Sequence, residues 1–369
     1  MKLFFRKTGL VLLLFITTRL YAQQSQQLKL WYDKPAANWN EALPIGNGRL
    51  AAMIFGRTET ECIQLNEETI WAGEPGNNIP SNVYDSIQQI RNLILGGKYK
   101  EAQDLSNKTF PRSAPANNNY GMQYQPAGNL IMQFPGHADV TNYKRELDIS
   151  NAIATTTYRV GETVFKREII AALPGAAIVV RITANKPSSI NCILFANTPH
   201  KTSYTKTQNR LLLFGGTTSS ADNKIGRIQF ETQVLPKPEG GSLTTTDTSI
   251  VISNANALTI FISIGTNFKN YHDISGDAGA RATSFLNSIA GKKYEPIKAE
   301  HIRLYKKYFD RVSLYLGDNP QSKKPTDARV REFNSAVDPQ LVALYFQFGR
   351  YLMIAGSQPN SQPTNLQGK

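Results

Sequence analysis

The stretch Leu28–Gly73 reads LKLWYDKPAANWNEALPIGNGRLAAMIFGRTETECIQLNEETIWAG and determines how the chain begins to fold. It contains two short apolar runs, Leu50–Gly56 and Cys62–Leu65, bounded by Gly, Thr and Glu, and such runs are typical of buried strands. The segment Pro44–Gly48 just before them supplies two glycines and an asparagine, the residue types that tolerate positive φ in turns. We therefore predict a β-hairpin preceded by a tight turn.

The segment that follows this hairpin, Asn66–Trp71 (NEETIW), crowds acidic, amide and indole groups into one strand exit. A sugar-binding surface needs polar groups beside an exposed aromatic ring, because the C–H faces of a sugar stack on the ring while its hydroxyls form hydrogen bonds. The composition of this segment is compatible with such a surface.

From this stretch to about Gly265, the pattern is strand after strand. One interruption, Asn82–Asn107, has apolar residues at helical intervals on both sides of a Gly-Gly pair, which predicts two inserted helices. Many strands at short spacing favour a large antiparallel β-sandwich, which we place at residues 28–275. The further predicted strands are Gly128–Phe134, Tyr143–Asp148, Ala152–Val160, Glu162–Ala172, Ala176–Ala184, Ser189–Ala196, Arg210–Gly215, Arg227–Val234, Ser249–Ser253 and Ala257–Ile264.

Helical patterns replace the strands after residue 275. Asp277–Ile289 and Lys298–Val312 carry apolar residues on one side, and we predict a helical linker over residues 276–335. A last helix begins at Asp338, which can cap it, with Pro339 in its first turn. Its apolar residues continue to Ile354 and occupy most of the circumference, so this helix is expected to have neighbours on several sides.

The first 22 residues predict export. Met1–Ala22 has a basic start, a short apolar core and a small residue at its end, as in a signal peptide, so we expect a periplasmic or secreted protein. The apolar core is too short to span a bilayer, and no later segment approaches the roughly 20 apolar residues that a membrane helix needs. We therefore expect no membrane span.

Charge, histidine and cysteine content exclude several classes of function. The net charge is +13, but Lys and Arg are scattered along the chain, which argues against a nucleic-acid partner. The four histidines lack metal-ligand spacing, and we expect no metal and no cofactor. Two cysteines, Cys62 and Cys192, do not make a disulfide framework; both lie in apolar contexts that favour small buried residues, and their pairing stays open.

Several segments together resemble glycoside hydrolase family 95, typified by bacterial α-L-fucosidases. The opening WYDKPAANWNEALPIGNGRLAAMIFG (31–56), followed by LNEETIWAG (65–73), is similar to the start of that family. Further similar segments follow in the same order, and the ordered set is more specific than any one of them. These segments are Tyr124–Leu130 (YQPAGNL), Tyr143–Asp148 (YKRELD), Phe348–Leu352 (FGRYL) and Pro363–Gly368 (PTNLQG).

The resemblance implies a mainly β fold in which a large antiparallel β-sandwich and linker helices precede an (α/α)6 barrel that holds the active site. Residues 336–369 would be the truncated start of this catalytic domain, with only its first helix. The family's inverting mechanism uses a glutamic acid and a water activated by asparagines backed by an aspartate, and we expect these groups to lie beyond Lys369. We therefore assign no catalytic residue within this chain.

Five residues are our candidate substrate contacts: Asn47, Glu67, Trp71, Gln123 and Asn365. Trp71 and Glu67, with Asn66, would lie in a loop over the sugar pocket that the resemblance implies; Asn47 and Arg49 are similarly placed. A structural role is an equal alternative: the indole packing at an interface, the glutamate capping backbone, the asparagine serving turn geometry and Gln123 marking a strand entry.

The resemblance implies that the whole protein removes terminal α-L-fucose from glycans and that this chain is inactive without its missing C-terminal catalytic domain. Its other partner would be a fucosylated oligosaccharide. Two alternatives stay open at this point: a carbohydrate-binding β-sandwich module without catalysis, and a related α-L-galactosidase. L-Fucose lacks only the 6-hydroxyl of L-galactose, so one pocket contact separates these two activities.

Overall fold

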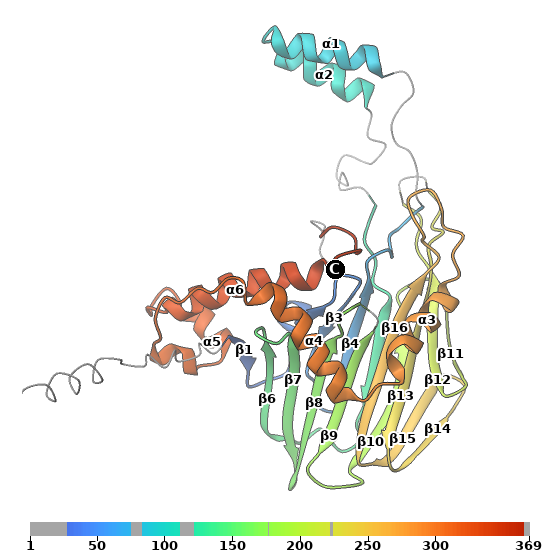
Figure 1. Ribbon diagram of the computed structural model, residues 1–369, viewed down its shortest axis with the longest axis vertical. Coiled ribbons are helices and arrows are strands. Elements are labelled where there is room, and N and C mark those ends of the chain that lie inside the picture. The colour runs from blue at the N-terminus through green and yellow to red at the C-terminus, as the bar shows by residue number, and fades with distance from the viewer. Residues whose placement is uncertain (1–27, 75–82, 111–121, 176, 222–223, 365–369) are drawn as a thin grey trace, which may run out of the picture.

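The computed structural model describes residues 28–74, 83–110, 122–175, 177–221 and 224–364. Two antiparallel sheets face each other and enclose the main core, which confirms the mainly β fold class and the predicted sandwich (Figure 1). The nine-stranded sheet has the order β1 (Lys29–Tyr32), β6 (Thr141–Asp148), β7 (Ile153–Val160), β8 (Thr163–Ala171), β9 (Ile178–Ala184), β16 (Ala257–Thr266), β13 (Gln229–Glu239), β12 (Leu211–Thr217) and β11 (Thr202–Gln208). The seven-stranded sheet has the order β14 (Ser242–Thr245), β15 (Ser249–Ala255), β10 (Ile190–Asn197), β5 (Gly128–Gln133), β4 (Thr60–Glu67), β3 (Leu50–Ile54) and β2 (Leu43–Gly46).

The predicted opening hairpin is confirmed as β3 and β4, which pair with Ala52 opposite Leu65. The ten later predicted strands are also present, with ends shifted by a few residues. Four strands were not predicted: β1, β2, β11 and β14. All four lie at sheet edges. Strand β11 (TSYTKTQ) is polar and largely exposed, so its sequence shows no alternating apolar pattern.

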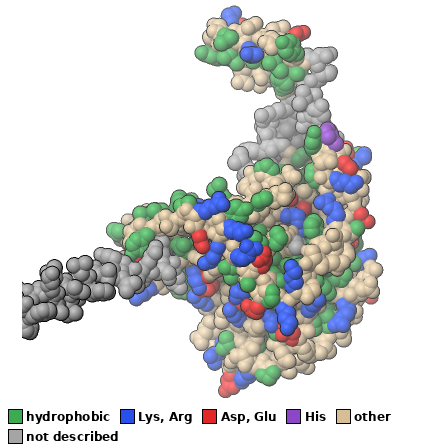
Figure 2. Space-filling model, viewed as in Figure 1, with side chains coloured by type: hydrophobic (Ala, Val, Ile, Leu, Met, Phe, Trp, Pro, Cys, Tyr) green, Lys and Arg blue, Asp and Glu red, His purple; other side chains and the backbone are tan. Residues whose placement is uncertain are grey.

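The helical pair interrupting the strands is confirmed as α1 (Tyr84–Leu95) and α2 (Tyr99–Thr109). The two helices pack on each other and project away from the sandwich (Figure 1). Apolar side chains remain on their surface (Figure 2). They include Leu95 and Tyr99, which are 84% and 69% exposed.

The C-terminal helices cover the nine-stranded sheet and one end of the sandwich. Helices α3 (Ala278–Ala290) and α4 (Tyr294–Phe309) pack apolar side chains against the outer face of β7, β8, β9 and β16. The 3-10 turns η1 (Trp39–Glu41) and η2 (Pro320–Lys323) and the short helix α5 (Thr326–Arg331) complete the surface. The prediction that the second linker helix extends to Val312 was wrong, because the helix ends at Phe309 and Val312 is exposed.

The last helix, α6 (Pro339–Gly356), begins as predicted: the Asp338 side chain accepts a hydrogen bond from the Leu341 amide at 3.0 Å. One side of the helix is buried, with Leu344 and Tyr351 each 1% exposed. The other side carries Tyr345 and Met353, which are 77% and 71% exposed. Within the described residues, therefore, the apolar circumference of α6 is covered on one side alone.

The remaining expectations concern the cysteines, the charge and the membrane. Cys62 and Cys192 are free, and burial raises the pKa of their thiols to about 11 and about 12, which keeps both protonated. Lys and Arg side chains are interspersed with Asp and Glu on the visible face (Figure 2). In the part of the chain that the structure describes, no helix has the length and hydrophobicity needed to cross a membrane.

A buried arginine connects the two sheets. Arg167 of β8 is 1% exposed and reaches across the core to the β3–β4 connection, where it donates hydrogen bonds to the carbonyl oxygens of Arg57 and Thr58, each at 2.6 Å. Its guanidinium also lies 3.3 Å from the carboxylate of Glu61 and stacks over the ring of Phe134 at 3.9 Å. Every one of these groups is in or beside the opposite sheet.

We expect Arg167→Met to lower the free energy of unfolding by about 3–5 kcal/mol, because the variant leaves the Glu61 carboxylate buried without its cation. Denaturant titration followed by tyrosine and tryptophan fluorescence measures the change. Arg303→Met is the matched control, since Arg303 lies on the surface and pairs with Glu300. Equal midpoints for the two variants would contradict this role for Arg167.

The exposed side of α6 predicts self-association of this chain. Tyr345→Lys combined with Met353→Lys should reduce association in concentration-dependent light scattering and leave the thermal midpoint unchanged, because both side chains are largely exposed. Leu344→Ala, on the buried side, should instead lower the free energy of unfolding by about 2–5 kcal/mol. A monomeric parent chain at all concentrations would refute the expectation.

Candidate functional site

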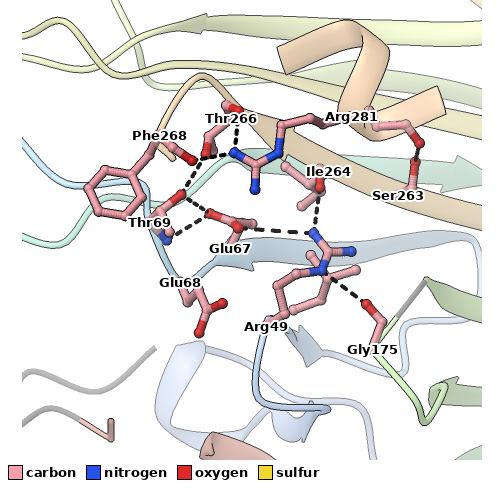
Figure 3. Close-up of polar contacts among 12 residues, drawn as sticks. Arg49, Glu67, Glu68, Thr69, Gly175, Ser263, Ile264, Thr266, Phe268 and Arg281 are labelled. Carbon is pink, nitrogen blue, oxygen red and sulfur yellow. Dashed lines mark hydrogen bonds and ion pairs between the residues drawn. The ribbon is translucent and has the colours of Figure 1, made fainter. Parts of the chain in front are cut away.

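The predicted site residues that the structure describes gather at one end of the sandwich. The β2–β3 turn, the end of β4 and the end of β16 meet there, and Figure 3 shows Arg49, Glu67 and Thr266 from these three elements. Arg49 follows the turn, Glu67 ends β4, and Thr266 ends β16. The C-terminal end of α6 also reaches this end, because the Gly48 amide donates a hydrogen bond to the Ala355 carbonyl at 2.8 Å.

Arg49 joins the seven-stranded sheet to the nine-stranded sheet at this end. Its guanidinium donates hydrogen bonds to the carbonyl oxygens of Gly175 at 3.0 Å and Ile264 at 2.6 Å (Figure 3). It also stacks 3.8 Å over the ring of Phe285. The carboxylate of Glu67 lies 4.0 Å away. Burial lowers the pKa of Arg49 to about 10, so the side chain stays cationic at neutral pH.

The Glu67 carboxylate is directed into the protein. It is 3% exposed, and its Oε2 accepts hydrogen bonds from the amide and the hydroxyl of Thr69, each at 2.7 Å. The Thr69 hydroxyl is 2.6 Å from that of Thr266, whose carbonyl accepts a hydrogen bond from Arg281 at 3.1 Å (Figure 3). This chain of contacts links β4 to β16 and α3.

Glu68 connects the same place to the C-terminal segment. Its carboxylate is 8% exposed and accepts a hydrogen bond from the backbone amide of Gln362. Two adjacent glutamates therefore face different neighbours: Glu67 interacts with the sandwich, and Glu68 with the segment that follows α6.

Asn47 organises the turn before β3. Its side-chain oxygen accepts a hydrogen bond from the Leu50 amide at 2.8 Å, and its nitrogen donates to the Ala172 carbonyl at 3.1 Å. The side chain is 2% exposed. The adjacent Gly46 lies so close to α6 that a Cβ would be 2.5 Å from the Ala355 carbonyl, which explains the glycine.

Trp71 and Gln123 lie side by side, although the inserted helices separate them in sequence. Trp71 bridges to Tyr124 in antiparallel fashion, their rings meet edge to face at 5.0 Å, and the indole donates to the Glu68 carbonyl at 2.9 Å. The Gln123 carbonyl accepts from the Ala72 amide at 2.8 Å, and its side chain is exposed. Asn365 lies outside the described residues.

The structure thus brings Asn47, Glu67, Trp71 and Gln123 to one end of the sandwich. The side chains of Asn47 and Glu67 are buried with internal partners, whereas Gln123 and the half-buried Trp71 remain accessible. Sugar contact by these residues stays a prediction. Thr266 and Arg281 were missed, because nothing in their local sequence signals that Thr266 meets Thr69, which is 197 positions earlier, or that Arg281 binds the Thr266 carbonyl.

An apolar cavity of about 210 Å³ lies beside this site, between β2, β3 and the end of α6. Asn66 and Thr364 are its polar lining residues, so the cavity offers few hydrogen bonds to a ligand. Among the described residues, no group of three or more His, Cys, Asp or Glu side chains could hold a metal ion.

Comparison with known families gives two matches along the chain. Residues 30–271 match the family described as "Glycosyl hydrolase family 65, N-terminal domain", and residues 293–369 match the "Glycosyl hydrolase family 95 catalytic domain". The chain belongs to the glycoside hydrolases. The resemblance found in the sequence is thereby confirmed.

Curated relatives of this glycoside hydrolase chain include "Alpha-L-fucosidase 2" from Arabidopsis thaliana, 31% identical over 93% of this chain and 44% of that protein. "Probable alpha-fucosidase A" from Aspergillus niger (strain ATCC MYA-4892 / CBS 513.88 / FGSC A1513) is 28% identical over 92% of this chain and 44% of its own length. The chain therefore spans less than half the length of these relatives.

A solved structure shares the fold of this glycoside hydrolase chain. The "Putative kojibiose phosphorylase from human microbiome" aligns with a TM-score of 0.50 over 89% of this chain and 41% of that chain. The sequence identity is 8%, so the likeness concerns the fold and carries no statement about activity.

We expect Asn47→Ala to lower the free energy of unfolding by about 1–3 kcal/mol, because the Ala172 carbonyl loses a buried donor and the Leu50 amide an acceptor. Gln123→Ala is the matched control: its side chain is exposed, and the variant should unfold at the parent denaturant concentration. Equal stability of the Asn47→Ala variant and the parent would show that these hydrogen bonds do not support the turn.

Proposed function

We propose that this chain is the N-terminal part of an exported glycoside hydrolase that removes terminal α-L-fucose from glycans by an inverting mechanism. The main support is the 31% identity to "Alpha-L-fucosidase 2" of Arabidopsis thaliana, which extends over 93% of the chain. The substrate would be a fucosylated oligosaccharide. Export to the periplasm or the exterior rests on the signal-peptide pattern of Met1–Ala22.

We further propose that the chain has no activity by itself. Inverting hydrolysis by a carboxylate pair needs a carboxylic acid and a base about 6.5–9.5 Å apart, with room for a water between them. Glu67 and Glu68 are both buried and bonded to neighbouring groups, which does not suit either role. The catalytic acid would lie in residues that follow Lys369, in the rest of the catalytic domain.

In this proposal the described end of the sandwich positions the catalytic domain. The Gly48 amide and the Glu68 carboxylate bond to the segment around Ala355 and Gln362, and the Tyr351 hydroxyl donates to the Pro44 carbonyl at 2.7 Å. These contacts fix the end of α6, after which Asn365 follows. Gln123 and Trp71 are accessible at the same end and are our remaining substrate-contact candidates in the described chain.

The proposal predicts that the purified chain releases no 4-nitrophenol from 4-nitrophenyl α-L-fucoside, while a protein extended by the remaining catalytic domain does. Proton NMR during early turnover of the extended protein should show β-L-fucose first, as inversion requires. Hydrolysis by the chain alone at the rate of the extended protein would overturn its inactivity. Preferential hydrolysis of the α-L-galactoside by the extended protein would overturn the fucosidase proposal.

A further inference from the structure

A second, polar groove lies on the outer face of the nine-stranded sheet. It has a volume of about 570 Å³, within the 300–1,000 Å³ that small-molecule sites occupy. Strands β11, β12 and β13 form its floor, and the first turn of α3 forms one wall. Unlike the apolar cavity beside α6, it is lined by hydroxyl, amide and carboxylate groups, including those of Thr202, Thr217, Gln229 and Asp277.

The ring of Tyr204 lies on the floor of this groove, across a glycine of the middle strand. Tyr204 of β11 stands opposite Gly215 of β12, which stands opposite Glu231 of β13. The Tyr204 hydroxyl donates to Glu231 Oε2, and a Cβ on Gly215 would be 3.0 Å from that hydroxyl oxygen. The ring therefore spans the middle strand, and Gly215 leaves the room for it to do so.

The position of Tyr204 leaves it accessible. The residue is 40% exposed, although its hydroxyl is held by a carboxylate on a strand two positions away in the sheet. A side chain fixed at its tip and open to solvent along its ring loses little conformational freedom when a ligand stacks on it. The ring is thus already in place before binding.

The carboxylate that holds Tyr204 is itself fixed. Glu231 Oε1 accepts a hydrogen bond from the side-chain nitrogen Nε2 of Gln233 at 2.7 Å. The same nitrogen also lies within hydrogen-bond distance of the Thr283 hydroxyl, at 2.9 Å, and of the Gly279 carbonyl, at 3.2 Å. A Cβ on Gly279 would lie 3.1 Å from Glu231 Oε1, so this glycine allows the carboxylate to approach the first turn of α3. The network joins the sheet to the helix.

We propose that this groove binds a neutral sugar unit of a glycan, with one sugar face stacked on Tyr204. Stacking of C–H groups on a tyrosine ring, together with hydrogen bonds to carboxylate, hydroxyl and amide groups at its rim, is how such a groove would recognise a polyhydroxylated ring. The carboxylates of Glu231 and Asp277 favour a neutral sugar over an acidic one, because like charges would meet in a small space. Lys206, whose Nζ is 5.7 Å from the ring centroid, could donate to a sugar hydroxyl.

This inference goes beyond the proposed function, since it assigns binding without hydrolysis to the described chain. It requires no residue after Lys369. Failure of fucoside hydrolysis in the extended protein would leave it standing, and failure of sugar binding in this groove would leave the proposed hydrolase activity standing.

The test is a titration of the purified chain, labelled with 3-fluorotyrosine, with L-fucose, D-galactose, lactose and 2′-fucosyllactose. The ¹⁹F resonance of Tyr204 is assigned by its loss in the Tyr204→Phe variant. We expect at least one of these sugars to shift that resonance saturably and to leave the Tyr315 resonance in place. No saturable shift at Tyr204 with any of the four sugars would overturn the proposal.

Variants then test the stacking contact. Tyr204→Ala should weaken binding of the responding sugar by about tenfold or more in saturation-transfer NMR, because the platform is lost. Tyr204→Phe should bind within about threefold of the parent chain, because the ring is kept. Tyr315→Ala is the matched control, since Tyr315 is an exposed tyrosine distant from β11 in the chain.

Two results would contradict the details of the proposal. Unchanged binding by a folded Tyr204→Ala variant would place the sugar elsewhere on the chain. Binding of D-glucuronate as strong as that of the neutral sugars would contradict the role given to the Glu231 and Asp277 carboxylates. If Tyr204→Ala does not fold, the fluorine titration of the parent chain still decides whether a sugar reaches Tyr204.

Discussion

The structure depends on arginine side chains that are buried between its two sheets. Arg167 crosses the core to the β3–β4 connection, and Arg49 crosses at the end of the sandwich to Gly175 and Ile264. A guanidinium offers five donors in one plane, so a single side chain can satisfy several carbonyl oxygens that the edges of strands leave unpaired. Because those carbonyls lie in the opposite sheet or in its connections, each arginine fixes how the sheets are placed against one another as well as how far apart they lie.

The same contacts explain how the end of the sandwich is built. Arg49, Glu67 and Thr69 bring β4 and β16 together, and Asn47 and Glu68 extend this arrangement to the neighbouring loop and the segment after α6. Polar residues in the motif Asn66–Trp71 therefore have mainly internal partners. Such a motif can be specific to a family because it positions a second domain, without every polar residue in it touching a substrate.

The sequence predicts the repeated elements of this fold well and its edges poorly. Apolar runs and helical periodicity identified the hairpin, ten later strands, the inserted helices and α6, because burial acts on residues close in sequence. The edge strand β11 was not predicted, since its exposed polar residues resemble those of a loop. The burial of Arg167 was not predicted either. Arg167 lies between Lys166 and Glu168 in the sequence, and only the fold shows that its side chain enters the core. For the candidate site, the sequence identified one strand and turn, but Thr266 and Arg281 join them through tertiary contacts that no local pattern encodes.

The bridge between Trp71 and Tyr124 has a consequence for how this domain could vary. The two residues hold together the ends of the insertion that contains α1 and α2. They pair through their backbones and meet edge to face through their rings, and the Tyr124 hydroxyl donates a hydrogen bond to the Glu67 carbonyl at 2.9 Å. Because these contacts hold the two ends of the insertion together, a longer insertion would add a loop-closure entropy cost that grows only slowly with its length. The register of β4 against β5 would be unaffected. Evolution could replace this insertion with another without changing the sandwich.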